Sequence, residues 1–298
     1  MRPEQIEERV GHPGELWDQL KERVQAESVQ KFSDVQADWL GIMWAFDAFR
    51  VSGQMPRNTE VYFGRTKPFK DLGGFYRTKG NLFAELTALL LQNQTAQEIG
   101  ARTKVQGFSQ EHQIDVAWPK RREDPLICAE TKITGAPAYG STPARGAFSD
   151  WSNRRKELKF AATDLKLFRR QQHTAIRHWG VWRRGAPPKT YFLWATRLSV
   201  GERSRDDSVD HMVTEARALV DTYLDGAGVF AWRTNAAATG YESVKVPVSA
   251  HVSDLDDVLY SIASEITTAV DESGGKTPEP ELPRRAAVDI EQLTEDSE

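Results

Sequence analysis

The sequence contains a single cysteine, Cys128, among its 298 residues. One cysteine excludes an internal disulfide and any zinc site built from several cysteines, and it fits a reducing, cytoplasmic compartment. No apolar run reaches the ~18 residues that a membrane-spanning helix needs, so we expect no membrane partner. The first ten residues are charged and no apolar segment follows them, which argues against a secretory signal.

Acidic charge is in small excess over the whole chain, but the two signs are unevenly distributed. The formal net charge is −4. Residues 151–189 carry eleven Lys and Arg against two acids, whereas residues 253–298 carry thirteen acids against three bases. A concentrated basic segment is the electrostatic pattern expected of a protein that binds a polyanion such as DNA.

The spacing of apolar residues predicts an alternation of helices and strands. Helices are expected over residues 1–52, followed by a basic and aromatic segment, 53–80, that a Gly-Gly pair interrupts. The next helix is expected to start at Gly80, to use Asn81 as its N-cap and to run to about Ile99. The later predicted elements are strands near 103–107, 112–118, 125–134, 189–198, 229–233 and 244–248, and helices over 151–178, over 208–223 and from Ser253.

Three regions follow from this pattern. They are a helical and basic-aromatic region over 1–79, a core over 80–270 and an acidic tail over 271–298. The tail is rich in Pro, Glu and Gly and has few apolar residues to bury, so we expect it to be disordered.

Two short apolar stretches carry isolated charged residues. The stretch 113–118 contains Asp115, and the stretch 126–133 contains Glu130 and Lys132. Because side chains alternate between the two faces of a strand, Glu130 and Lys132 project to the same side. A charge within an apolar strand is costly unless it has a partner or a metal ion. An antiparallel pairing of the two strands would bring Asp115 near Glu130, which predicts a metal site with a built-in cation.

A third acid, Glu85, lies in a helical segment three residues after Leu82 and four before Leu89. This spacing places its side chain along the apolar stripe of the helix, and we expect it to join the acids of the two strands. The alternative for this group is a buried ion pair of Lys132 with Glu85 or Glu130, since such carboxylates also serve plain ion-pair networks.

A helix with Glu85, a strand with Asp115, a strand with the Glu-Thr-Lys motif at 130–132 and then a further helix resemble the PD-(D/E)XK nuclease superfamily, the fold of many type II restriction endonucleases. The resemblance covers residues 80–200 and rests on the order, spacing and strand context of the motif. The sequence departs from the family name at Ile114, which stands where the name has proline. The resemblance implies an α/β fold with an αβββαβ core, a mixed sheet flanked by helices, to which an N-terminal helical extension is added.

The acids also fit a metal ion on chemical grounds. Carboxylate oxygens suit Mg²⁺, which takes phosphate oxygens as well, and Mn²⁺ can substitute for it. Asp115 and Glu130, together with the backbone carbonyl of Thr131, are expected to hold the ion. The ion would polarise the phosphate and lower the pKa of the attacking water, and Lys132 would orient that water or stabilise the developing charge. Glu85 would bind a second ion or a metal-bound water.

These features predict a Mg²⁺-dependent, sequence-specific endonuclease of double-stranded DNA, a type II restriction enzyme that acts as a homodimer. The alternatives are a repair, resolvase or modification-dependent nuclease of the same fold, or a non-catalytic nucleic-acid-binding protein whose acids are structural. The residues expected to contact DNA are Arg57, Asn58, Arg65, Lys67, Arg154, Arg155, Lys156, Arg169, Arg170, Arg183 and Arg184. Among them, the loop residues Arg57, Asn58, Arg183 and Arg184 are expected to read bases. The helix residues Arg154, Arg155, Arg169 and Arg170 are expected to contact phosphates.

Overall fold

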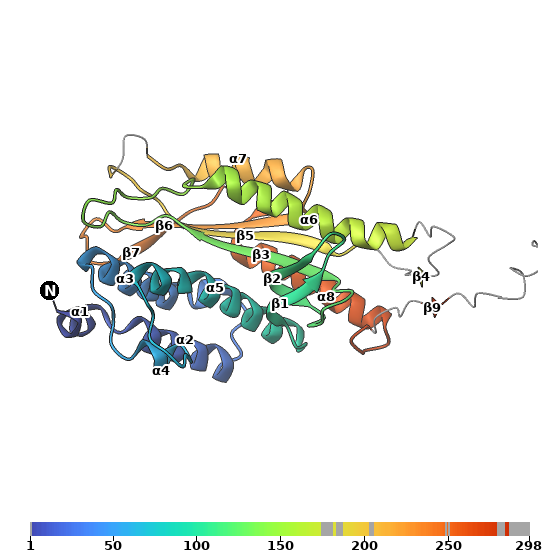
Figure 1. Ribbon diagram of the computed structural model, residues 1–298, viewed down its shortest axis with the longest axis horizontal. Coiled ribbons are helices and arrows are strands. Elements are labelled where there is room, and N and C mark those ends of the chain that lie inside the picture. Colours follow the sequence, from blue (N-terminus) through green and yellow to red (C-terminus); the bar gives the residue numbers. More distant parts are fainter. Residues whose placement is uncertain are drawn as a thin grey trace, which may run out of the picture.

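The computed structural model describes residues 2–173, 181–182, 187–202, 206–247, 249, 251–278 and 284–285. Within these ranges the chain forms three layers, a mixed sheet with helices against both of its faces (Figure 1). The expected α/β class, with a mixed sheet between helices, is confirmed.

The described helices are α1 (Pro3–Val10), α2 (Pro13–Ala26), the short 3-10 helix η1 (Phe32–Asp34), α3 (Gln36–Ser52), α4 (Thr59–Tyr62), α5 (Leu72–Thr95), α6 (Trp151–His173), α7 (Val209–Val220) and α8 (Leu255–Glu272). The described strands are β1 (Gly100–Gln106), β2 (Glu111–Trp118), β3 (Ile127–Thr134), β4 (Val181–Trp182), β5 (Lys189–Arg197), β6 (Gly226–Thr234), β7 (Tyr241–Val244), β8 (Val252–Ser253) and β9 (Arg284–Arg285).

The main sheet of the described part has seven strands in the order β1-β2-β3-β5-β6-β7, with β8 also paired to β6. The hairpin β1-β2 and the pair β2-β3 are antiparallel, whereas β3, β5 and β6 run parallel to one another. Strands β4 and β9 pair separately. Helix α6 connects β3 to β5 and α7 connects β5 to β6, and both lie on one face of the parallel strands. Helices α5 and α8 lie on the other face, so these strands are covered on both faces, as strands of this kind require.

Each face of the sheet has its own apolar core. On one face α5 and α8 pack against residues such as Trp118 of β2 and Leu193 of β5. On the other face α6 and α7 cover β5 and β6, and the rings of Trp151 and Trp194 stack with centroids 4.3 Å apart. Helices α1, α2 and α3 lie on the same side of the sheet as α5, and α2 and α3 contact it (Figure 1). Helix α5 is thus enclosed between the sheet and the N-terminal helices.

Helix α5 begins at Leu72 rather than at Gly80, so the predicted start was wrong. The N-cap is Asp71, whose carboxylate accepts a hydrogen bond from Gly74 N at 2.5 Å, and Asn81 lies inside the helix. Because the first amides of a helix lack partners in the helix itself, this cap allows a start at a point where the glycines suggested a break. The helix therefore crosses the expected boundary between the first two regions.

The C-terminal elements also differ from the prediction. Helix α8 continues to Glu272, past the expected start of the tail, and most of the remaining tail lies outside the described residues. In place of the strand expected over 244–248, the structure has strand β7, which lies earlier in the chain and ends at Val244. No helix in the described part of the chain is long and apolar enough to cross a membrane.

Asp164 of α6 ties this helix to the connection between β1 and β2. Its Oδ2 lies 2.8 Å from Nε2 of His112, and its Oδ1 accepts hydrogen bonds from the backbone N and Oγ of Ser109 at 2.9 and 2.7 Å. Burial raises the pKa of the Asp164 carboxyl, but the hydrogen bonds from Ser109 and His112 outweigh it and hold the pKa below its usual value. This buried contact fixes the helix that lies beside the charged residues of β3.

We expect Asp164→Ala to lower the free energy of unfolding at neutral pH by about 2–4 kcal/mol, because His112 and Ser109 lose their partner in a buried place. Since the pKa of Asp164 is held low in the folded state, its contribution is present above the ordinary Asp pKa and is lost as the pH falls through the folded value. Denaturant unfolding of wild type and variant should therefore differ at neutral pH and converge in acid. The control is Asp221→Ala, an exposed acid near Arg217, which should change stability by less than about 1 kcal/mol. An equal effect of both variants would contradict this role.

Candidate active site

Lys132 lies between the carboxylates of Asp115 and Glu130. Its Nζ is 2.9 Å from Oε2 of Glu130 and 3.5 Å from Oδ2 of Asp115. The three side chains are only 19–24% exposed, so water screens their charges weakly. The structure thus brings together the three charged residues that the two strands were expected to supply.

The two acids lie where strands β2 and β3 stop pairing. The last pair of the antiparallel ladder is Val116 with Ala129, and Asp115 and Glu130 are the next residues beyond this pair on the two strands. Beyond this point the Asp115 carboxylate takes the place of a backbone acceptor. Its Oδ2 accepts hydrogen bonds from the backbone N of Thr131 at 2.9 Å and from Thr131 Oγ1 at 3.1 Å. An acid side chain that accepts from the backbone of the neighbouring strand fixes the position of its carboxylate relative to β3.

On its other side, β3 stays paired with β5 through the site. Glu130 and Lys132 stand opposite Phe192 and Trp194 in the parallel pairing of β3 with β5, and this pairing extends over the whole of β3. Because the strand is held on this side, the alternation of its side chains is preserved, and Glu130 and Lys132 emerge on one face. The site therefore rests on the middle of the sheet rather than on a loop.

The cluster holds two acids and one ammonium in a partly buried place. Burial raises the pKa of Glu130 to about 7, with Lys132 lowering it and Asp115 raising it. Burial disfavours the charged form of Lys132 too, but the charges of Glu130 and Asp115 outweigh this effect and raise its pKa. The ammonium of Lys132 stays charged. Glu130 shares this one ammonium with Asp115, so a further cation nearby would favour the charged form of the Glu130 carboxyl.

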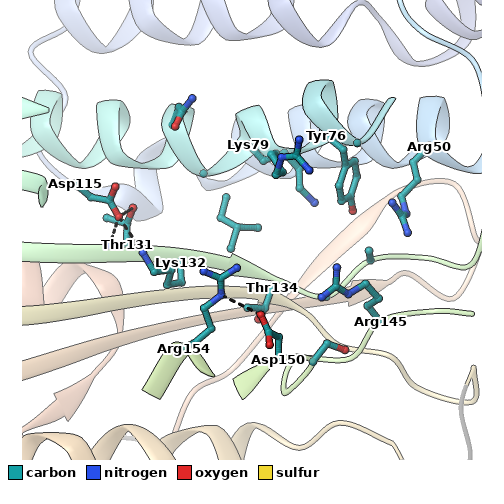
Figure 2. Close-up of a pocket in the computed structure, with 18 residues that line it drawn as sticks. Arg50, Tyr76, Lys79, Asp115, Thr131, Lys132, Thr134, Arg145, Asp150 and Arg154 are labelled. Carbon is teal, nitrogen blue, oxygen red and sulfur yellow. Dashed lines mark hydrogen bonds and ion pairs between the residues drawn. The ribbon is translucent and has the colours of Figure 1, made fainter. Parts of the chain in front are cut away.

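A pocket of about 420 Å³ opens beside this cluster. Asp115, Thr131 and Lys132 lie at one of its ends, and residues of α3, α5, α6 and the loop after β3 line the rest (Figure 2). Glu130 does not line the pocket; it lies behind Lys132, beside Cys128 of β3 and Leu158 of α6. An anion in the pocket would thus meet Asp115 and Lys132 directly and Glu130 only through them.

Glu85 is not part of this cluster, and the expectation that it points toward the strand acids was wrong. Its Oε1 is 2.6 Å from Nζ of Lys21 in α2, and it does not line the pocket. Helix α5 is buried around most of its circumference, so the spacing from Leu82 and Leu89 did not mark the direction of the sheet. The side chain leans toward the half-exposed edge between α5 and α2, where it forms an ordinary ion pair.

The basic residues expected before α5 lie away from the pocket. Arg57 forms ion pairs with two glutamates of α1, at 3.0 and 3.5 Å, so acids from outside its segment neutralise its charge. Asn58 has a left-handed backbone and precedes α4, and the guanidinium of Arg65 lies 3.9 Å above the ring of Phe69. Lys67 is exposed. None of these four residues lines the pocket.

The basic helix α6 contributes one residue to the pocket, Arg154. Its guanidinium pairs with Asp150 at 3.8 Å and with Glu157 at 3.0 Å. Arg155 pairs with Glu215 of α7 at 3.3 Å, and Lys156 is exposed. The side chains of Arg169 and Arg170, and the whole of Arg183 and Arg184, lie outside the described residues.

Sequence reasoning missed two other cations of the pocket. They are Arg50 of α3 and Arg145 of the loop after β3, whereas Arg77 and Lys79 of α5, which also line the pocket, belong to the basic segment 53–80 that the sequence singled out. No periodicity or motif joins these positions, because only the packing of α3 and α5 against the end of β3 brings them together. With Lys132 and Arg154, the lining holds six cations against two acids, Asp115 and Asp150. Of these cations, Lys79 is balanced by the buried Asp47, which lies outside the lining.

Comparisons of the chain with protein-family models, with curated proteins and with solved structures found no match. In the part of the chain that the structure describes, no three or more His, Cys, Asp or Glu side chains gather as a set of metal ligands.

We expect Glu85→Gln to change the free energy of unfolding by less than about 1 kcal/mol, because its ion pair with Lys21 is more than a third exposed. Cleavage of DNA, the activity expected from the sequence, should not depend on Glu85. Thermal melts and cleavage rates of the variant, with Lys21→Met as the matched partner variant, measure both effects. A large loss of activity at unchanged stability would show that Glu85 serves the site after all.

Proposed function

We propose that this protein is a metal-dependent nuclease that hydrolyses phosphodiester bonds in double-stranded DNA. The observation that carries the proposal is the position of Lys132, whose ammonium lies between two carboxylates at the end of a cationic pocket. A pocket lined by cations attracts a polyanion such as DNA. The carboxylates at one end of the pocket would repel the phosphates of that polyanion unless a metal ion neutralised this repulsion.

The residues present fit a Mg²⁺ ion, for which Mn²⁺ would substitute. Asp115, Glu130 and the backbone carbonyl of Thr131 would hold it, since Mg²⁺ needs only one or two carboxylates and keeps several waters. The hydrogen bonds from Thr131 and the contact with Lys132 all use Oδ2 of Asp115, so Oδ1 is the oxygen that a cation would take. When bound, the ion would supply Lewis-acid chemistry, with a lowered pKa for its water and polarisation of the phosphate.

The chain's own residues provide positioning and charge. The Lys132 ammonium can donate to an attacking water or to a phosphate oxygen that gains negative charge, and its carboxylate partners hold it in place. The Thr131 amide fixes Asp115, so the acid does not have to reorganise when substrate enters. Arg154 lines the pocket near Lys132, and its guanidinium can bind a phosphate oxygen of DNA (Figure 2).

The order of the elements supports assignment to the PD-(D/E)XK nucleases. Helix α5, strands β1, β2 and β3, helix α6 and strand β5 occur in the order of the αβββαβ core, with the two-residue strand β4 between α6 and β5. Asp115 is on the second strand of this series and the Glu-Thr-Lys motif on the third. Within that superfamily we propose a type II restriction enzyme that works as a homodimer on double-stranded DNA. A repair, resolvase or modification-dependent nuclease would use the same cluster, and sequencing the ends of a digested plasmid separates these activities.

We expect Asp115→Asn, Glu130→Gln and Lys132→Met each to lower the single-turnover rate of plasmid cleavage with Mg²⁺ by about a hundredfold or more. The matched control is Lys159→Met. Lys159 belongs to a second Glu-x-Lys triplet, on α6, where its ammonium lies 4.6 Å from the ring of Tyr223 and outside the pocket. This control should cleave at the wild-type rate under saturating DNA. Equal losses at Lys132 and Lys159 would contradict the assignment.

Loss of an acid should not weaken DNA binding. Asp115→Asn removes a negative charge from the cationic pocket, so the affinity for DNA, measured in EDTA at low salt, should equal or exceed that of wild type. Thermal melts verify that the variant is folded. A variant that lost binding and cleavage together would indicate a structural role for the carboxylate, as expected of a non-catalytic DNA-binding protein.

A further inference from the structure

The end of the pocket away from Asp115 is lined by arginines. Figure 2 shows Asp115 and Lys132 at one end of the pocket and Arg50 and Arg145 at the opposite end. In the part of the chain that the structure describes, no Asp or Glu oxygen lies within 4.0 Å of the guanidinium of Arg50 or Arg145. Two cations without an acidic partner face the same space, so their charge is available to an anion from outside.

Arg50 is held in a fixed orientation. It stands in the last turn of α3, its Nε donates a hydrogen bond to the carbonyl of Pro137 at 3.2 Å, and its guanidinium lies 4.7 Å from the centre of the Tyr76 ring. These contacts use Nε and one face of the group. The two terminal nitrogens form no hydrogen bond with any described residue, and such a planar fork matches two oxygens of a phosphate.

Arg145 reaches the pocket from the opposite wall. Its backbone pairs with that of Ala136, through two hydrogen bonds of 2.8 Å, just after the end of β3. This pairing fixes the returning arm of the loop against the strand that carries Lys132. The side chain of Arg145 is exposed, and it forms no ion pair with an acid of the described residues.

The buried acid Asp47 has partners other than these arginines. Asp47 of α3 accepts hydrogen bonds from the hydroxyl groups of Tyr76, at 2.5 Å, and Tyr241, and Nζ of Lys79 lies 3.7 Å away. Lys79 and Asp47 are both almost completely buried and balance one another in charge. The positive charge of Arg50 therefore remains in excess on the pocket side of this network.

We propose that Arg50 and Arg145 together bind a second, non-scissile phosphate of the DNA strand whose scissile phosphate lies beside Lys132. This inference rests on the proposed nuclease function and adds an anchoring site to it. The Arg154–Asp150 ion pair lies between the two ends of the pocket, so one phosphate does not serve both (Figure 2). Anchoring a phosphate away from the reacting one fixes the register of the strand without reading its sequence.

The test is the binding of a short random-sequence DNA duplex in EDTA over a range of salt concentrations. Arg145→Gln and Arg50→Gln should each weaken binding about tenfold, because each removes a hydrogen bond between charged groups. The slope of log K against log salt should fall by about one unit in the Arg145→Gln, Arg50→Gln double variant, which loses one phosphate contact. The control is Arg217→Gln, an exposed arginine of α7, which should leave affinity and slope unchanged.

A double-mutant cycle tests whether the two arginines share one phosphate. If they do, the double variant should lose little more affinity than either single variant, since the second arginine alone binds the phosphate poorly. Fully additive losses would place the arginines on different phosphates and overturn the shared site. Because Arg50 also packs on Tyr76, thermal melts accompany its variants; if Arg50→Gln unfolds, Arg50→Lys replaces it in the cycle.

The source of the phosphate is resolved by comparing duplexes with 5′-phosphate and 5′-hydroxyl ends. Equal losses on both duplexes identify an internal phosphodiester, and a loss seen only with 5′-phosphates identifies a terminal phosphate. Unchanged affinity and salt slope in Arg145→Gln, in a protein that still binds and cleaves DNA, would overturn the anchoring site and leave the proposed nuclease intact. A wild-type protein that neither binds nor cuts DNA would instead overturn the nuclease proposal.

Discussion

The arrangement of the site depends on the separation of strands β2 and β3 at Asp115 and Glu130. If the antiparallel ladder continued past Val116, backbone amides would pair with carbonyls and Asp115 would have no role in it. Instead the ladder ends, and the Asp115 carboxylate accepts from the Thr131 backbone. The separation leaves space for Lys132 to reach both acids, while β5 holds the other side of β3. A functional group is thus placed on a rigid strand, where its position is fixed by main-chain hydrogen bonds.

Charge in and around the pocket follows from this arrangement. At one end two acids share one ammonium, and at the other end two arginines have no acidic partner among the described residues. The acidic end suits a cation and the basic end suits an anion, and a phosphodiester strand with a metal ion supplies both. The mildly acidic net charge of the chain says little about this surface, because residues 253–298, with thirteen acids against three bases, account for more than the whole acidic surplus.

The sequence predicted the parts of the site that depend on local periodicity. Alternation along a strand was enough to place Glu130 and Lys132 on one side, and an antiparallel neighbour was enough to bring Asp115 to them. The α/β class and most strand positions follow from the same patterns. Helix α5 was less well predicted, because the cap at Asp71 overrode two glycines and because burial around most of the helix hid the direction of Glu85.

The other residues of the pocket could not be found in this way. Arg50 and Arg145 are far apart in the sequence and become neighbours only when α3 and the loop after β3 pack around α5. The partner of Arg57 was also hidden, since its acids come from α1. Charge in a segment therefore indicated a polyanion partner, but only the tertiary structure shows which cations are already neutralised.

The central claim is that the carboxylates around Lys132 serve a metal ion in the hydrolysis of DNA. Incubation of the wild-type protein with a supercoiled plasmid of known sequence, in buffers with Mg²⁺, with Mn²⁺ or with EDTA, tests it most directly. The account predicts discrete linear fragments with Mg²⁺ or Mn²⁺ and intact plasmid in EDTA. Cleavage that persists in EDTA, or intact plasmid under all three conditions despite tight DNA binding, would contradict it.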